Sequence, residues 1–435
     1  MSGKAVAPHR ASPWADRNFR WLMAGGMMSM TGDQFTLIAL PWLVLALSGD
    51  PLALGFVIAL MGIPRAVFIL IGGAVVDRHS PQRVMMWSKH ASAVLLGLLA
   101  ALTLAGQATL PVVYGLALAI GLAQAFGIPS GTAMLPRSVP PALLQQANAA
   151  MMGMRQLAML AGPLLAALLL ALAGGTPDAA GAAAASVGEM RALGLAFAVD
   201  CATFILSAFT LARVRPTGTV PRANEEGVLR SVGAGLAMVW RDTALRACFL
   251  YWGLVALLVG GAMQVALPLL ADDVLADDVL QGAASLGILM GAHGAGTLLG
   301  MALAPLAARL ALPFGALLLI GDGLAGLLLA PLGGIESIWQ ATALLAGLGF
   351  IGGLLQVAIF TWIGRRVAPQ MLGRAMSIFL FIFLGLAPLS AAITGALLQH
   401  VSLATLYFAC GALLLCCAVN AWLFTPIRKI AAAPA

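Results

Sequence analysis

Six ionisable side chains stand inside long apolar stretches of this 435-residue chain, where a charged group is costly. An acid or base at the centre of a membrane-spanning helix costs about 2.5 to 3.5 kcal/mol, so such residues are usually paired or face a water-filled cavity. A carboxylate in this setting can take up a proton on one side of a membrane and release it on the other. The six residues are Asp33, Arg65, Arg155, Asp200, His293 and Asp322.

Asp33 is the strongest candidate for a proton carrier, because it lies near the middle of an apolar stretch over residues 21–47. Arg155 could provide its counter-charge, Arg65 is the competing partner, and Asp200 is the next candidate carrier. The alternative for Asp33 is a permanently paired structural acid. A packing role is the favoured interpretation for the acids and the histidine on later helices, Asp200, Asp322 and His293.

The elements that position these residues are expected to be membrane-spanning helices. The chain is 61% hydrophobic and 9% charged, whereas soluble domains carry about 25% charged residues. Apolar stretches of about 20 residues can cross a bilayer as helices. The pattern predicts an all-α membrane protein with twelve transmembrane helices in two six-helix halves. The expected spans cover residues 19–47, 52–76, 83–105, 109–133, 142–173, 191–213, 246–271, 283–308, 311–333, 337–363, 373–398 and 402–425.

Basic residues indicate which side of the membrane the loops face. Most of the 23 Lys and Arg residues, Lys89 included, are assigned to one side. Cytoplasmic loops carry such an excess, so both termini are predicted to be cytoplasmic, in a bacterial inner membrane. Part of the linker between the halves is expected to form an amphipathic surface helix. The predicted organisation is a tail at 1–18, an N-terminal half at 19–213, a cytoplasmic linker at 214–245, a C-terminal half at 246–425 and a second tail at 426–435.

A short loop after the second expected helix carries a distinctive pattern. Gly73 is followed, after three residues, by Asp77 and Arg78, with Arg83 further along. A glycine permits close helix approach, and an acid at the membrane edge can meet a helix N-terminus and a basic side chain. The pattern resembles the loop signature of the major facilitator superfamily. That resemblance implies a cytoplasmic gate formed by Gly73, Asp77, Arg78, Arg83 and Arg374.

Further stretches resemble one branch of that superfamily, the bacterial efflux proteins related to macrolide and enterobactin exporters. Ala158, Gly162 and Pro163 in the fifth expected helix are similar to the antiporter motif of exporters, in which small residues and a proline shape a close helix crossing. Ordinary packing is the alternative interpretation of these three residues. The other matching stretches include Asn18-Phe19-Arg20, Gly32-Asp33, Leu135-Pro136, Ala147-Asn148-Ala149, Phe197-Ala198-Val199-Asp200 and Gly373-Arg374-Ala375-Met376-Ser377.

The resemblance also implies that spans one, four, seven and ten surround a central cavity, with spans two, five, eight and eleven as gates. Span four departs from the superfamily, because residues 112–133 hold no charge. Flexible apolar and amide side chains on the cavity helices would suit an amphipathic solute. The candidate cavity residues are Met30, Gln124, Gln264, Gln356 and Trp362.

These features predict a secondary active transporter, specifically a proton-coupled exporter of an amphipathic organic compound such as a drug, macrolide or siderophore. The expected partners are that small molecule, protons and the lipid bilayer, with the chain acting as a monomer. No cofactor, metal site, nucleic-acid partner or enzyme activity is expected, because the sequence lacks metal-ligand spacing, a phosphate-binding loop and a catalytic constellation. Two alternatives stay open: an uptake symporter or facilitator, and a non-transporting membrane sensor or lipid-handling scaffold.

Overall fold

The computed structural model describes residues 12–78, 80–173, 182–215, 228–273, 279–307, 309 and 312–431. Across these residues the chain forms helices, and twelve segments are long and apolar enough to cross a membrane. Helices suit this environment because each satisfies its own backbone hydrogen bonds without water. The expected all-α fold with twelve spanning segments is therefore confirmed.

Spans one to six belong to the N-terminal half. Asp16 caps the first helix by accepting hydrogen bonds from the backbone N–H groups of Asn18 and Phe19, and Gly49 ends it with a left-handed φ of 61°. The spans are α1 (Arg17–Ser48), α2 (Pro51–Arg78), α3 (Pro81–Leu104), the consecutive helices α4 (Leu110–Ala125) and α5 (Gly127–Met134), α6 (Leu144–Ala173) and α7 (Ala182–Ala212).

Spans seven to twelve belong to the C-terminal half and follow the linker helix α8 (Val228–Arg241). Span seven combines α9 (Thr243–Gly261), a π-helical turn (Ala262–Ala266) and α10 (Leu267–Asp273). The remaining spans are α11 (Val279–Ala307), α12 (Phe314–Leu329) with a 3-10 turn (Ala330–Gly334), α13 (Ile338–Arg366), α14 (Pro369–Leu397) and α15 (Leu403–Phe424).

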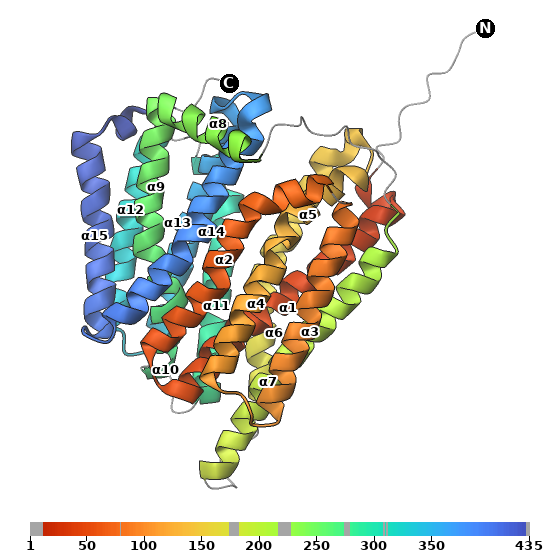
Figure 1. The fold of residues 1–435 in the computed structure, drawn as a ribbon. Coiled ribbons are helices and arrows are strands. Elements are labelled where there is room, and N and C mark those ends of the chain that lie inside the picture. The colour runs from red at the N-terminus through yellow and green to blue at the C-terminus, as the bar shows by residue number, and fades with distance from the viewer. Residues whose placement is uncertain are drawn as a thin grey trace.

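The two halves share one apolar core on one side of the molecule and have separate cores on the other. The shared core joins Leu43 and Val57 of the N-terminal half to Leu286 of the C-terminal half. The separate cores, one around Phe19 and one around Trp252, lie on the side that carries the start of α1 and helix α8, called here the termini side (Figure 1). The halves are therefore joined most tightly on the side opposite the termini.

Two helix pairs make this contact between the halves. Helix α2 packs on α14, where an added Cβ at Gly55 would lie 2.6 Å from the Ala391 carbonyl oxygen. Helix α6 packs on α11, where an added Cβ at Gly287 would lie 2.8 Å from the Pro163 carbonyl oxygen. Small residues at both crossings let the helix backbones approach closely.

Helix α8 matches the surface helix predicted within the linker. It packs across the start of α14, where an added Cβ at Gly235 would lie 3.2 Å from Arg374 Cβ. Leu236 and Trp240 on the same helix are largely exposed. An exposed apolar face of this kind suits a helix that lies in the membrane interface.

Candidate functional site

Asp33 takes part in a chain of polar contacts between three helices of the N-terminal half. Its side chain is half-buried on α1, and the Gln124 amide on α4 donates a hydrogen bond of 3.1 Å to Asp33 Oδ1. Arg65 on α2 donates through Nη1 to Gln124 Oε1 at 3.4 Å. Gln124, expected to line the cavity, therefore connects the Asp33 carboxylate to the Arg65 guanidinium.

Two cations, on Arg65 and Lys89, lie close enough to Asp33 to interact with it electrostatically. Arg155 on α6, the first counter-charge that the sequence suggested, instead interacts with Arg65, a like charge. The structure thus places the competing partner, Arg65, beside Asp33 and corrects the expectation for Arg155. Which cation approaches Asp33 depends on how each helix is rotated about its own axis, and hydropathy does not encode that rotation.

Lys89 is the residue of this site that the sequence interpretation missed. It was assigned to the basic residues of the cytoplasmic side, yet it is only 5% exposed and its Nζ donates to Ser29 Oγ on α1 at 3.2 Å. The ammonium also lies over the Phe204 ring, 5.5 Å from its centroid. A signal was available, because Lys89 falls inside the span expected over residues 83–105.

Asp200 on α7 is fully buried, and its carboxylate is turned toward α1. It accepts hydrogen bonds from the hydroxyls of Thr36 and Thr203, at 2.5 Å and 3.3 Å. Gly32 makes the close approach possible, since an added Cβ there would lie 2.6 Å from Asp200 Oδ1. The charges of Asp33 and Asp200 are near enough to interact, so two acids share this region.

The remaining expected cavity residues have different surroundings. Met30 on α1 is half-buried, Gln264 is half-buried in the π-helical turn, and Gln356 on α13 is exposed. Trp362 is only 2% exposed and its ring stacks on Phe314, with centroids 4.7 Å apart. Trp362 is therefore a core residue of the C-terminal half and not a cavity residue, because its large apolar surface is buried against neighbouring aromatic rings.

The antiporter-like motif lies at a crossing of helices. Ala158 and Gly162 are buried on α6, and an added Cβ at Gly162 would lie 2.7 Å from Gln34 Cβ on α1. Pro163 stands inside α6 and faces α11 through its carbonyl group. The motif thus packs α6 closely against a helix of each half, while its link to antiport stays a prediction.

The expected gate falls largely outside the described residues. Nothing is described of the side chains of Gly73, Asp77 and Arg78, which end α2. Arg83 is exposed on α3, and Arg374 is half-buried at the start of α14, where it donates to Met371 Sδ at 3.4 Å. The gate therefore stays a prediction.

A second buried acid lies in the C-terminal half. Asp322 on α12 is 6% exposed and faces the Tyr251 hydroxyl on α9. The distance and angle between the two groups do not meet the criteria for a hydrogen bond. Among the described residues, neither Asp322 Oδ2 nor the Tyr251 hydroxyl has a hydrogen-bond partner.

His293, the last of the ionisable residues within the spans, is half-buried on α11. In the described part of the chain, no group of three or more His, Cys, Asp or Glu side chains could hold a metal ion.

Comparison with known proteins adds to this geometry. The model of the Major Facilitator Superfamily matches residues 22–383. The multidrug efflux pump Tap of Mycobacterium tuberculosis is 26% identical over 94% of this chain and 93% of its own length. An uncharacterized MFS-type transporter, y4rN of Sinorhizobium fredii, is 27% identical over 90% of this chain and 91% of its own. The solved structure of the nucleoside transporter NupG is similar in fold, with a TM-score of 0.68, 15% identity and coverage of 93% of this chain and 98% of that one.

Proposed function

Because the chain belongs to the Major Facilitator Superfamily, it is a membrane transporter and not an enzyme, and we propose that it exports an amphipathic organic compound in exchange for protons. Its similarity to a pump named for multidrug efflux supports the direction of transport. The observation that carries proton exchange is Asp33, a carboxylate within span one that accepts a hydrogen bond from a neutral amide and interacts with two cations.

The Asp33 site has the physical properties that exchange requires. When Asp33 is charged, it balances part of the positive charge of Arg65 and Lys89. When Asp33 is protonated, the positive charge of Arg65 and Lys89 is no longer balanced, so the electrostatic potential around the site becomes more positive. A proton and a bound compound then influence each other's affinity through one charged group, and such coupling between two ligands is reciprocal.

The arrangement of the halves supports alternating access. We assign the termini side to the cytoplasm, because basic residues concentrate in the loops and tails of that side. Because the halves share their core on the opposite side, we propose that the present conformation is the inward-facing one. In the outward-facing state the proposed gate of Gly73, Asp77, Arg78, Arg83 and Arg374 would close the cytoplasmic side.

The compound would bind between the halves, close to Asp33. Met30 stands one turn before Asp33 on α1, and flexible thioethers adapt to ligands of different shape. Gln264 and Gln356 would donate and accept hydrogen bonds from the C-terminal half. The π-helical turn that contains Gln264 supports this assignment, since such turns often mark functional positions within α-helices.

Transport in proteoliposomes tests the proposal. Amphipathic cations and macrolides are first screened for thermal stabilisation of the purified protein, and the hits are then assayed for transport driven by a pH gradient. Asp33→Asn removes the titrating group and nearly keeps the side-chain shape. Gradient-driven transport by this variant should fall to the level of protein-free liposomes, while exchange without a gradient survives.

Asp322→Asn is the matched control, because it neutralises a buried acid on a span of the other half and should keep gradient-driven transport. Full gradient-driven transport by Asp33→Asn, normalised to folded protein, would remove the carrier role. Movement of compound and protons in the same direction would indicate a symporter. A protein that binds several hits but moves none of them, and that tolerates Asp33→Asn, would be a sensor or scaffold.

A further inference from the structure

Lys89 differs from Arg65, the other cation near Asp33, because it comes from span three, outside the cavity and gate spans. Helix α3 packs mainly on α7, with additional contacts to α4 and α5. The Lys89 side chain crosses the seam between α1 and α7, where Ser29, Ser207 and Thr210 are also buried. Burying an ammonium is costly unless it is paired and hydrogen-bonded. The groups that contact Lys89 therefore indicate its role.

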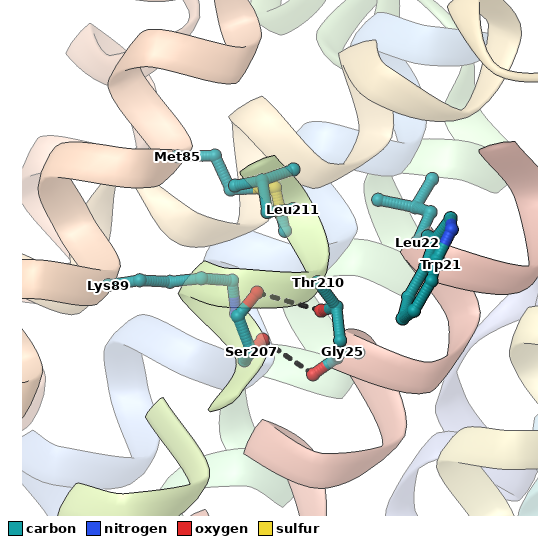
Figure 2. Close-up of a pocket in the computed structure, with 9 residues that line it drawn as sticks. Trp21, Leu22, Gly25, Met85, Lys89, Ser207, Thr210 and Leu211 are labelled. Atoms are coloured by element: carbon teal, nitrogen blue, oxygen red, sulfur yellow. Dashed lines mark hydrogen bonds between the residues drawn. The ribbon is translucent and has the colours of Figure 1, made fainter. Parts of the chain in front are cut away.

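The hydroxyls around Lys89 are oriented as acceptors. Ser29 and Ser207 both donate to the Gly25 carbonyl oxygen, at 3.1 Å and 2.6 Å. Their own oxygens are therefore left to accept, and Ser29 Oγ accepts from Lys89 Nζ. Figure 2 shows Lys89 extending from α3 toward Ser207 and Gly25 at a small pocket on the termini side, with Trp21 and Leu22 across it.

These contacts hold the ammonium beside Ser29, which lies one helical turn before Asp33 on the same face of α1. The hydroxyl oxygen of Ser29 and the face of Phe204 both stabilise a cation at this position. A cation near a carboxylate favours the charged form of that carboxylate and so weakens its hold on a proton.

The other charges around this pair come from each neighbouring helix. Asp200 and Cys201 lie on α7, Arg65 lies on α2, and Arg155 on α6 interacts with Arg65. Helices α4 and α5 also pack on α3, and their one titratable side chain, Tyr114, contacts Phe56 on α2 instead. Among the cations within reach of Asp33, Lys89 is the one that approaches from outside the ring of cavity and gate helices.

We propose that Lys89 is a positioning residue that sets the proton affinity of Asp33 from the outer side of span one. The proposal deepens the proton coupling proposed above and rests on it, because a set proton affinity matters for transport only if Asp33 exchanges protons. Lys89 itself need not contact the transported compound. It tunes the pH range in which Asp33 loads and releases its proton.

The test is an infrared pH titration of the full chain in lipid nanodiscs. The carbonyl stretch of the protonated carboxyl is assigned to Asp33 as the band that is missing in Asp33→Asn, and its intensity is followed against pH. Removing the cation by Lys89→Met should move the midpoint of this band to higher pH by about one unit or more. Lys89→Arg keeps the charge and should restore the wild-type midpoint to within a few tenths of a unit.

Gly26→Leu is the matched control for packing. Gly26 lines the same pocket, and an added Cβ there meets no atom within 4 Å, so a larger side chain fills the space and leaves the charge in place. Its midpoint should equal that of the wild type. An equal shift in Gly26→Leu and Lys89→Met would overturn the proposal, because it would point to pocket hydration and not to the ammonium.

An unchanged midpoint in Lys89→Met would also overturn the proposal. If Lys89→Met does not fold, Lys89→Gln keeps a polar side chain without the charge and should show the same upward shift. The titration does not depend on transport, so the two proposals can fail separately. The protein could show the expected band shift and yet no gradient-driven transport. That result would overturn the proposed function and would still support the role of Lys89 in setting the proton affinity of Asp33.

Discussion

Corresponding spans of the two halves build buried polar clusters that differ in charge balance. Spans one, three and six hold Asp33, Lys89 and Asp200, whereas spans seven and nine hold Tyr251 and Asp322. In the first cluster the acids are accompanied by cations and by hydroxyl donors. In the second, as far as the described residues go, Asp322 faces a hydroxyl and contacts no basic side chain.

This difference shows that equivalent positions in a repeated fold do not imply equivalent roles. A group that loads and releases a proton needs surroundings that tolerate both of its charge states, and nearby cations with flexible donors provide them. A buried acid without a cation has no such compensation for its charged form. The N-terminal cluster therefore suits charge handling, and the C-terminal cluster suits a fixed structural role.

The largest expected effect on stability comes from replacing the buried acid of the N-terminal cluster, Asp200. This change should destabilise the protein, whereas the matching change in the C-terminal cluster should not. Asp200→Leu should lower the free energy of unfolding by about 2 to 4 kcal/mol, because it leaves the Thr36 hydroxyl without its acceptor and places an apolar side chain against Gly32. Unfolding by SDS in mixed micelles, followed by tryptophan fluorescence, measures the change. A variant as stable as the wild type would show that the buried hydrogen bond between Thr36 and Asp200 contributes little.

The matching change in the C-terminal half should act in the opposite direction. Asp322→Leu removes a carboxyl oxygen that has no hydrogen-bond partner among the described residues and replaces it with apolar volume. Such replacements are neutral or stabilise a protein, here by up to about 2 kcal/mol. The same SDS unfolding assay checks it. Strong destabilisation would mean that Asp322 has a partner role like that of Asp200, and the contrast between the halves would disappear.

The smallest expected effect concerns an ion pair on the termini side. Asp242 caps α9 and pairs with Arg366 at the end of α13, with 3.0 Å between Arg366 Nε and Asp242 Oδ2. Partial burial acts to raise the pKa of Asp242. The hydrogen bond from Arg366, the backbone N–H groups of Leu245 and Ala244 and the Arg366 charge together outweigh it, so this pKa lies below its ordinary value.

The sign of the pH dependence follows from that lowered pKa. A carboxyl whose pKa is lower in the folded state stabilises the fold above its unfolded pKa, and the contribution is lost as the pH falls through the folded pKa. The side chains of Arg366 and Asp242 are 41% and 27% exposed. Asp242→Asn should therefore lower the free energy of unfolding near neutral pH by less than about 1 kcal/mol.

The difference between Asp242→Asn and the wild type should shrink as the pH falls below about 4, the ordinary pKa of an aspartate. SDS unfolding at a series of pH values measures this difference. Asp322→Leu, which replaces a buried acid and leaves the ion pair intact, is measured alongside for comparison. A difference that stays constant down to acidic pH would assign the effect to helix capping geometry and not to the ion pair.

The amino-acid sequence by itself determined the membrane-spanning architecture. Each span is a local property, because about 20 consecutive apolar residues satisfy the bilayer wherever the rest of the chain lies. The expected limits agree closely with α1, α3 and α15. Asp33 was also identifiable, since a lone acid in the middle of an apolar stretch is conspicuous without any knowledge of its neighbours.

Only the tertiary structure decided which residues surround Asp33. Lys89 and Arg65 approach it, Arg155 does not, and Trp362 is buried in the core of the other half. The physical reason is that contacts between helices depend on how each helix is rotated and where it crosses its neighbours, which small residues such as Gly32 control through close packing. Hydropathy along one helix reports its depth in the membrane and leaves these rotations open.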